Sequence, residues 1–166
     1  MTINPFAEYK AVLENVGAKL NPPASLHQIL DAKSEGMPEF ICDLYSLFDG
    51  MLGETVDPRN ELHICSVSDC REYKLDALSN WNLNNIDNLY IIGHVLIYGF
   101  YIAVGRDRHD GVFYLGSSVD RAFCEFDDFL EKILEGNYWR NTVADLWITV
   151  TVRITVTVNQ LRCFSI

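Results

Sequence analysis

Apolar side chains recur every three or four positions in the first fifty residues, which predicts helices. The first such stripe runs from Phe6 to Val16 and ends at Gly17. A second helix is expected from Leu26 to Ser34, because Ser25 and Gln28 have the spacing of a capping box. Its predicted inner face consists of Leu26, Ile29 and Leu30.

A third helix is expected to begin at Pro38, whose missing N–H would be unpaired in any first turn. Gly50 suits the left-handed position that follows a helix, so the helix is expected to end just before it. The apolar residues at helical spacing between them are Ile41, Leu44, Tyr45 and Phe48.

Beyond Gly50 the pattern changes to short runs rich in β-branched and aromatic residues, which indicate strands. One helix is expected within this region, capped by Ser68 or Asp69 and reaching about Leu78. A polar turn from Arg106 to Asp110 predicts a hairpin, and an amphipathic pattern predicts a closing helix from Phe126 to Leu134. The expected strands are Leu62–Ile64, Tyr90–Gly93, Val95–Val104 and Val112–Leu115.

The last part of the chain alternates strictly between aliphatic and polar positions from Ile148 to Val158. This period of two predicts a β-strand of roughly 36 Å, at about 3.3 Å per residue. An unpaired strand of that length invites aggregation, so it should dock on its own sheet or pair with a second copy as a homodimer. The sequence therefore predicts a single α+β domain over residues 1–145, followed by a β-strand extension over 146–166.

Composition restricts the partners of the protein. The 166 residues are 49% hydrophobic and 22% charged, as in globular domains, and the net charge is −10. All 23 acidic residues lie within residues 1–145. Nucleic acid is disfavoured as a partner, since phosphate binding needs clustered Lys and Arg. A basic protein is favoured, because opposite potentials speed encounter.

Targeting and redox features favour the cytoplasm. The N-terminal residues show no signal-peptide pattern, and no apolar run is long enough for a membrane span. The five cysteines are odd in number and scattered along the chain, which suits free thiols in a reducing compartment.

Few residues suggest chemistry. His63, Cys65 and Cys70 could be three zinc ligands, but a fourth is not apparent, so a packed core is favoured. Cys42 lies between apolar neighbours and is interpreted as a packed thiol. The Arg106–Asp110 turn lacks the alternating acidic ligands of a calcium loop. We therefore expect no catalytic residues, no metal and no cofactor, and the chain is not expected to be an enzyme.

Residues Pro22 to Gly50 resemble the N-terminal signature of the SUKH superfamily, which includes fungal Smi–Knr regulators of cell-wall synthesis and bacterial toxin-immunity proteins. The shared features are a Pro-rich turn, a Met-Pro break between helices, and a helix ending in Tyr-x-x-x-Asp-Gly. The closing helix is also similar, although Glu125 replaces the usual Ser. The residues that carry the family pattern are Pro38, Tyr45, Gly50, Phe126, Phe129 and Leu130.

The resemblance implies helices packed on a mainly antiparallel sheet and an immunity protein that binds and neutralises a toxin domain, for example a nuclease. The alternative is a regulatory adaptor of cell-wall synthesis or signalling with several protein partners. Acidic residues in loops are the expected contacts with a basic partner. The candidates are Asp49, Glu54 and Asp57 after the third helix, and Asp107 and Asp110 in the hairpin turn.

Overall fold

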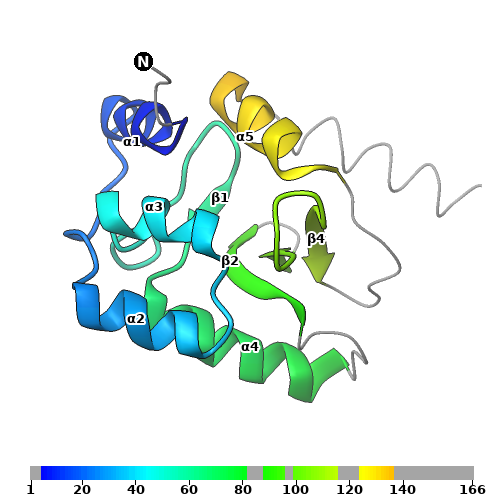
Figure 1. Ribbon diagram of the computed structural model, residues 1–166. Coiled ribbons are helices and arrows are strands. Elements are labelled where there is room, and N and C mark those ends of the chain that lie inside the picture. Colours follow the sequence, from blue (N-terminus) through cyan, green and yellow to red (C-terminus); the bar gives the residue numbers. More distant parts are fainter. Residues whose placement is uncertain (1–4, 82–87, 96–98, 116–123, 137–166) are drawn as a thin grey trace, which may run out of the picture.

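A computed structural model describes residues 5–81, 88–95, 99–115 and 124–136 of the chain. Within these residues there are five helices and one four-stranded antiparallel sheet, so the predicted α+β class is confirmed (Figure 1). The helices are α1 Pro5–Asn15, α2 Leu26–Ser34, α3 Glu39–Leu47, α4 Val67–Trp81 and α5 Phe126–Glu135. The strands are β1 Leu62–Ile64, β2 Tyr90–Val95, β3 Phe100–Val104 and β4 Val112–Leu115.

The strands lie in the sheet in sequence order, β1-β2-β3-β4, and each neighbouring pair is antiparallel. The register places His63 opposite His94 and Tyr101 opposite Leu115. A bulge interrupts β2 between Ile91 and Gly93. The helix α4 connects β1 to β2, so two hydrogen-bonded strands are joined by a long segment instead of a tight turn.

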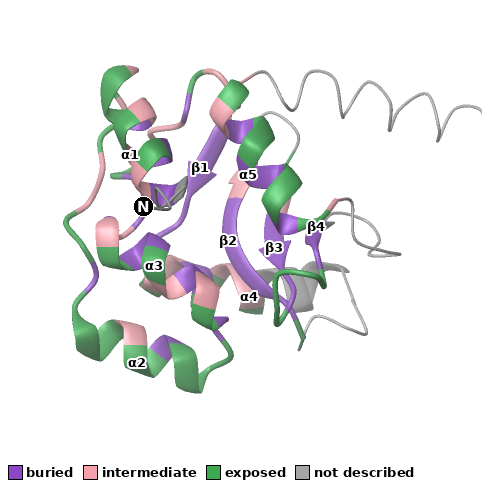
Figure 2. Ribbon diagram, turned by 45° about the horizontal axis from the view of Figure 1, so that its top comes forward, coloured by how far each residue is buried: buried purple, intermediate pink, exposed green. Residues whose placement is uncertain are grey.

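Helices cover both faces of the sheet (Figure 1). The main core lies between one face and the apolar sides of α1, α3 and α5, and it buries the large side chains Tyr9, Tyr45, Phe126 and Phe129. A smaller cluster lies on the other face beneath α4, where Tyr73 packs against Tyr101. Figure 2 shows the buried strands between these helices, whose outer sides are exposed. The predicted arrangement of helices on an antiparallel sheet is thus confirmed.

The N-terminal boundaries of α2 and α3 follow from local sequence features. The expected capping box of α2 is present, because Ser25 Oγ accepts from the Gln28 N–H and the Gln28 side chain accepts from the Ser25 N–H at 2.9 Å. Pro38 precedes α3 as its N-cap in an extended conformation, with φ −63° and ψ 145°. The prediction that Pro38 is the first helical residue is therefore wrong by one position.

The predicted inner face of α2 is wrong at Leu26 and Leu30, whereas Ile29 is partly buried and packs against the main core as expected. Leu26 is 72% exposed and Leu30 is 53% exposed, whereas the small residue Ala32 is buried. The helix α2 packs against α3 and α4, and its covered face carries the buried Ala32 and the partly buried Ile29. The two leucines therefore lie on a free surface of the described structure.

The helix α4 begins earlier than expected. Ser66 Oγ accepts a hydrogen bond from the Asp69 N–H at 3.2 Å and donates to its carboxylate at 2.7 Å. Ser66 therefore takes the capping position that the sequence assigned to Ser68 or Asp69. Among the described residues no helix is both long and apolar enough to cross a bilayer. The expected strand Ile148–Val158, and with it the whole 146–166 extension, lies outside the described residues.

Candidate functional site

The two acidic loops predicted to bind a partner lie at opposite ends of α5. At the C-terminal end, the guanidinium of Arg59 donates to the carbonyl oxygens of Ile133 and Leu134 at 3.1 and 2.8 Å. At the N-terminal end, Arg108 of the hairpin turn donates to the Asp127 carboxylate at 2.5 Å. A helix of 10 residues spans about 15 Å, so α5 bridges the two loops.

The exposed side of α5 is acidic. Phe126, Phe129, Leu130 and Ile133 face the core, which leaves the opposite side of the helix to solvent. Figure 2 shows that the outer side of α5 is exposed. Asp128, Glu131 and Glu135 are exposed at positions i, i+3 and i+7, a spacing that places them in one stripe along the helix. The amphipathic pattern of this segment was recognised in the sequence, but the acidic stripe was not singled out, although the same spacing reveals it.

The hairpin turn has an ordered backbone. The Asp107 carboxylate accepts from the N–H groups of His109 and Asp110 at 2.8 and 3.2 Å, and Asp110 accepts from the Asp107 N–H at 3.2 Å. The Arg108 guanidinium lies 5.6 Å from the ring centroid of Phe126. The predicted polar turn is confirmed, and Asp107 and Asp110 are exposed beside the start of α5.

Asp57 lies in the interior instead of on the loop surface. Its side chain is 0% exposed, and its carboxylate accepts hydrogen bonds from Tyr9, Arg59 and Asn60. Asn60 also donates to the Ile133 carbonyl at 2.8 Å, so this network ties the loop to both α1 and α5. The expectation that Asp57 contacts a partner is wrong for this geometry, because a fully buried carboxylate offers no surface.

Asp49 has a structural partner as well. Its half-buried carboxylate accepts from the Val67 N–H at 2.7 Å, at the first residue of α4. Burial raises the pKa of Asp49, and the hydrogen bond from Val67 opposes this rise. Glu54 is exposed in the same loop. The surface candidates from the sequence are therefore Glu54, Asp107 and Asp110, and α5 adds a third acidic surface.

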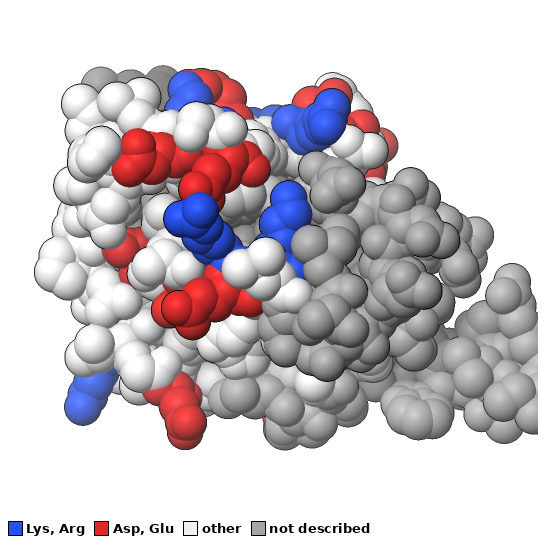
Figure 3. All heavy atoms as spheres, turned by 90° about the horizontal axis from the view of Figure 1, so that it is seen from below, with Lys and Arg blue, Asp and Glu red and all other residues white. Residues whose placement is uncertain are grey.

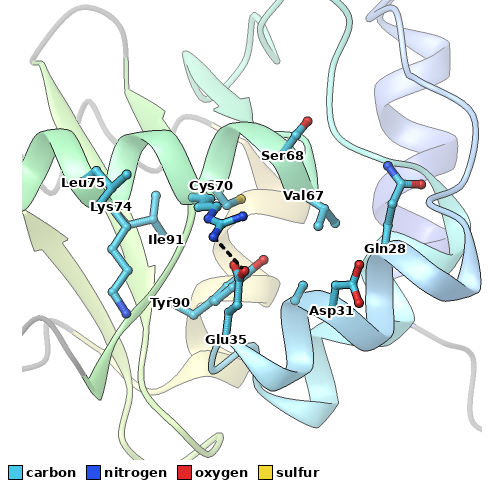
Figure 4. Close-up of a pocket in the computed structure, with 12 residues that line it drawn as sticks. Gln28, Asp31, Glu35, Val67, Ser68, Cys70, Lys74, Leu75, Tyr90 and Ile91 are labelled. Atoms are coloured by element: carbon cyan, nitrogen blue, oxygen red, sulfur yellow. Dashed lines mark ion pairs between the residues drawn. The ribbon is translucent and has the colours of Figure 1, made fainter.

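A groove of about 320 Å³ lies between α2 and α4 (Figure 4). Its floor includes Tyr90 and Ile91 of the sheet, and its rims carry acidic residues on α2 and basic residues on α4. An ion pair of 3.2 Å between Glu35 and Arg71 links the two rims. Figure 3 looks onto this side of the molecule, where acidic and basic side chains are neighbours. The mixed charge distinguishes the groove from the α5 stripe.

A cluster of potential metal ligands lies on the sheet face beneath α4. The ligand atoms of His63, Cys65 and His94 all lie within 4.8 Å of one another. Cys70, which the sequence grouped with His63 and Cys65, lies beside Cys65 but is not part of this group, and its Sγ is 3.1 Å from the Tyr45 hydroxyl. Burial lowers the pKa of His94 to about 4, with His63 adding to the effect, and burial raises the pKa of the Cys65 thiol.

Comparisons with known proteins leave the family open. No protein-family description matches the sequence, and a search of curated proteins finds no similar chain.

Proposed function

We propose that this chain is a protein-binding domain that captures a basic protein surface and acts as an immunity protein against a toxin domain. The observation that supports the proposal is the acidic stripe of Asp128, Glu131 and Glu135 on α5, a helix that runs from the Arg106–Asp110 turn to Arg59 and Asn60 of the loop after α3. The net charge of −10 extends the same negative potential around the molecule. Such a potential accelerates encounter with a basic partner and orients it.

The stripe is suited to a rigid contact. The helix α5 is anchored by four buried side chains on its inner face and by Arg59, Asn60 and Arg108 at its ends. Arg108 is paired with Asp127, so it neutralises that carboxylate and not one of the three stripe residues. A partner would therefore meet pre-positioned carboxylates, which reduces the entropy lost on binding.

The toxin part of the proposal rests on the resemblance to the SUKH superfamily. The positions that carry its pattern have structural roles in this fold: Pro38, Tyr45, Phe126, Phe129 and Leu130 are buried, and Gly50 has a positive φ of 71°. A nuclease toxin is a suitable target, because the surface with which it holds phosphate is basic. An adaptor that binds several signalling proteins is the competing outcome.

Binding kinetics test the proposal. The partner is the toxin domain encoded by a neighbouring gene, or a protein recovered by pull-down with the purified chain. The variant D128N/E131Q/E135Q removes three negative charges from the stripe. Its control, E8Q/D43N/E72Q, removes three from exposed positions on α1, α3 and α4. We expect the stripe variant to lower the association rate about tenfold at low salt, with a much smaller effect of the control.

Co-expression with the partner domain in cells distinguishes the immunity function from the adaptor function. Restored growth on co-expression supports the immunity function, and loss of this protection in the stripe variant links it to α5. Binding without protection supports the adaptor instead. Equal association rates for the stripe variant, the control variant and the unmodified chain would refute the proposed contact surface.

A further inference from the structure

The antiparallel register of β1 and β2 brings three metal-binding side chains together. His63 and Cys65 are two positions apart, so they extend from the same face of the sheet. His94 on β2 lies directly opposite His63. Gly93 allows this close approach, because a Cβ there would lie 2.3 Å from the His63 carbonyl oxygen. The cluster is thus built from rigid, neighbouring strands.

The distances are close to those of a tetrahedral zinc site. Zinc binds imidazole nitrogen at about 2.0–2.1 Å and thiolate at about 2.3 Å, so adjacent N and S ligands lie about 3.5 Å apart. The Cys65 Sγ and His94 Nδ1 atoms are 3.7 Å apart. All three ligand atoms lie within 4.8 Å of one another.

The His63 ring is held in the tautomer that a metal needs. Its Nδ1 lies 2.6 Å from the Thr55 carbonyl oxygen, which can only accept a hydrogen bond. Nδ1 therefore carries the proton and donates it, which leaves the lone pair on Nε2 for a metal. A backbone carbonyl that accepts from the second ring nitrogen is the usual support of a metal-bound histidine.

We propose that His63, Cys65 and His94 bind one Zn²⁺, with a fourth coordination position open to water. Two imidazoles and one thiolate suit zinc, whereas magnesium and calcium prefer oxygen ligands. On binding, the Cys65 thiol loses its proton to solvent and its sulfur donates an electron pair to the metal. His63 is 3% exposed and Cys65 is 0% exposed, so the metal would link β1 to β2 inside the fold. Among the described residues, this is the one group of three or more His, Cys, Asp or Glu side chains whose ligand atoms lie within 4.8 Å of one another.

The full chain is stripped with a chelator and titrated with Zn²⁺ against a chromophoric competitor, and separately with Co²⁺. We expect one zinc per chain and a cobalt spectrum with a thiolate charge-transfer band. The ligand variants are C65S and H94Q. C42S is the control, because Cys42 is a free thiol on α3, outside the ligand cluster. H94Q should weaken zinc binding at least tenfold, C65S should abolish the charge-transfer band, and C42S should change neither.

The thermal midpoint gives a second readout. Zinc should raise the melting temperature of the unmodified chain and of C42S, but not that of H94Q. Because His94 is only half-buried, H94Q should retain the fold. If C65S does not fold, the thiolate band in the cobalt spectrum of the unmodified chain is the measurement that tests coordination by a cysteine. Absence of a thiolate band there, or equal zinc affinity in H94Q, would overturn the proposal.

Discussion

Gly50 lies so close to Cys65 that a Cβ at residue 50 would be 2.5 Å from the Cys65 carbonyl carbon and oxygen. The chain after α3 passes directly beside the end of β1, where Met51 N–H donates to the Ile64 carbonyl at 2.8 Å. Gly50 also has φ +71°, a conformation that other residues rarely adopt. Its role is therefore to join the helical half of the domain to the first strand.

Gly50→Ala should destabilise the fold by at least about 2 kcal/mol, from left-handed strain plus a collision with backbone that cannot rotate away. Gly53→Ala is the matched control: it has φ +61°, but nothing lies within 4 Å of its Cβ position. The control should lose about 1 kcal/mol from strain alone. Urea unfolding of both variants measures the difference, and equal losses would show that the contact with Cys65 is unimportant.

Asp57→Ala should destabilise the protein by about 3–5 kcal/mol, because it leaves the Arg59 guanidinium without its counter-charge and removes an acceptor from Tyr9 and Asn60 in the interior. Glu54→Ala, in the same loop but exposed, should change stability by less than about 0.5 kcal/mol. Chemical denaturation at neutral pH provides the measurement. A loss below about 1 kcal/mol for Asp57→Ala would mean that the network is not a structural anchor.

Asp49→Asn should be nearly neutral at pH 7, since an amide oxygen can still accept from the Val67 N–H without burying a charge. Asp49→Ala should cost about 1 kcal/mol by leaving that N–H unpaired. The raised pKa of Asp49 means that the folded state binds a proton more readily than the unfolded state. The unmodified chain should therefore gain stability relative to Asp49→Asn as the pH falls from 7 towards about 3.9, the unfolded-state value. A difference that does not change with pH would contradict this assignment.

Phe129→Ala should cost about 3–5 kcal/mol, because the ring is 1% exposed in the main core between α5 and the sheet. Glu131→Ala, on the opposite side of α5, is the control and should be close to neutral. Thermal unfolding monitored by circular dichroism compares the two. A neutral effect of Phe129→Ala would show that α5 does not close the core.

Much of the fold could be predicted because its local patterns agree with its tertiary contacts. The Ser25–Gln28 capping box and the Arg106–Asp110 turn are short-range features, and the sequence contains everything that determines them. Leu26 and Leu30 were misplaced because helical periodicity identifies an apolar face, but not whether any other element covers it. Asp57 was misplaced for the opposite reason. An acidic residue in a loop is usually exposed, and here hydrogen bonds from Tyr9 of α1 and from Arg59 and Asn60 of its own loop make its burial favourable.

The candidate sites depended more strongly on tertiary structure. His63 and Cys65 were recognisable, but the third member of their cluster is 29 residues from Cys65 and becomes a neighbour only through strand pairing. The acidic stripe was visible in principle, because Asp128, Glu131 and Glu135 follow a helical spacing. What the sequence lacked was the position of α5 between the two loops.

The contacts of Arg59 and Asn60 with the last turn of α5 have a consequence for local opening. Carbonyl groups in the last turn of a helix have no partner within the helix, so the ends of helices commonly fray. Here, side chains from more than seventy residues earlier in the chain hold the carbonyls of Ile133 and Leu134. The amide hydrogens of α5 should therefore exchange with solvent as slowly as those of the central strands, as part of one cooperative unit. In Asp57→Ala, which releases Arg59 and Asn60, the α5 amides should exchange before those of β2 and β3.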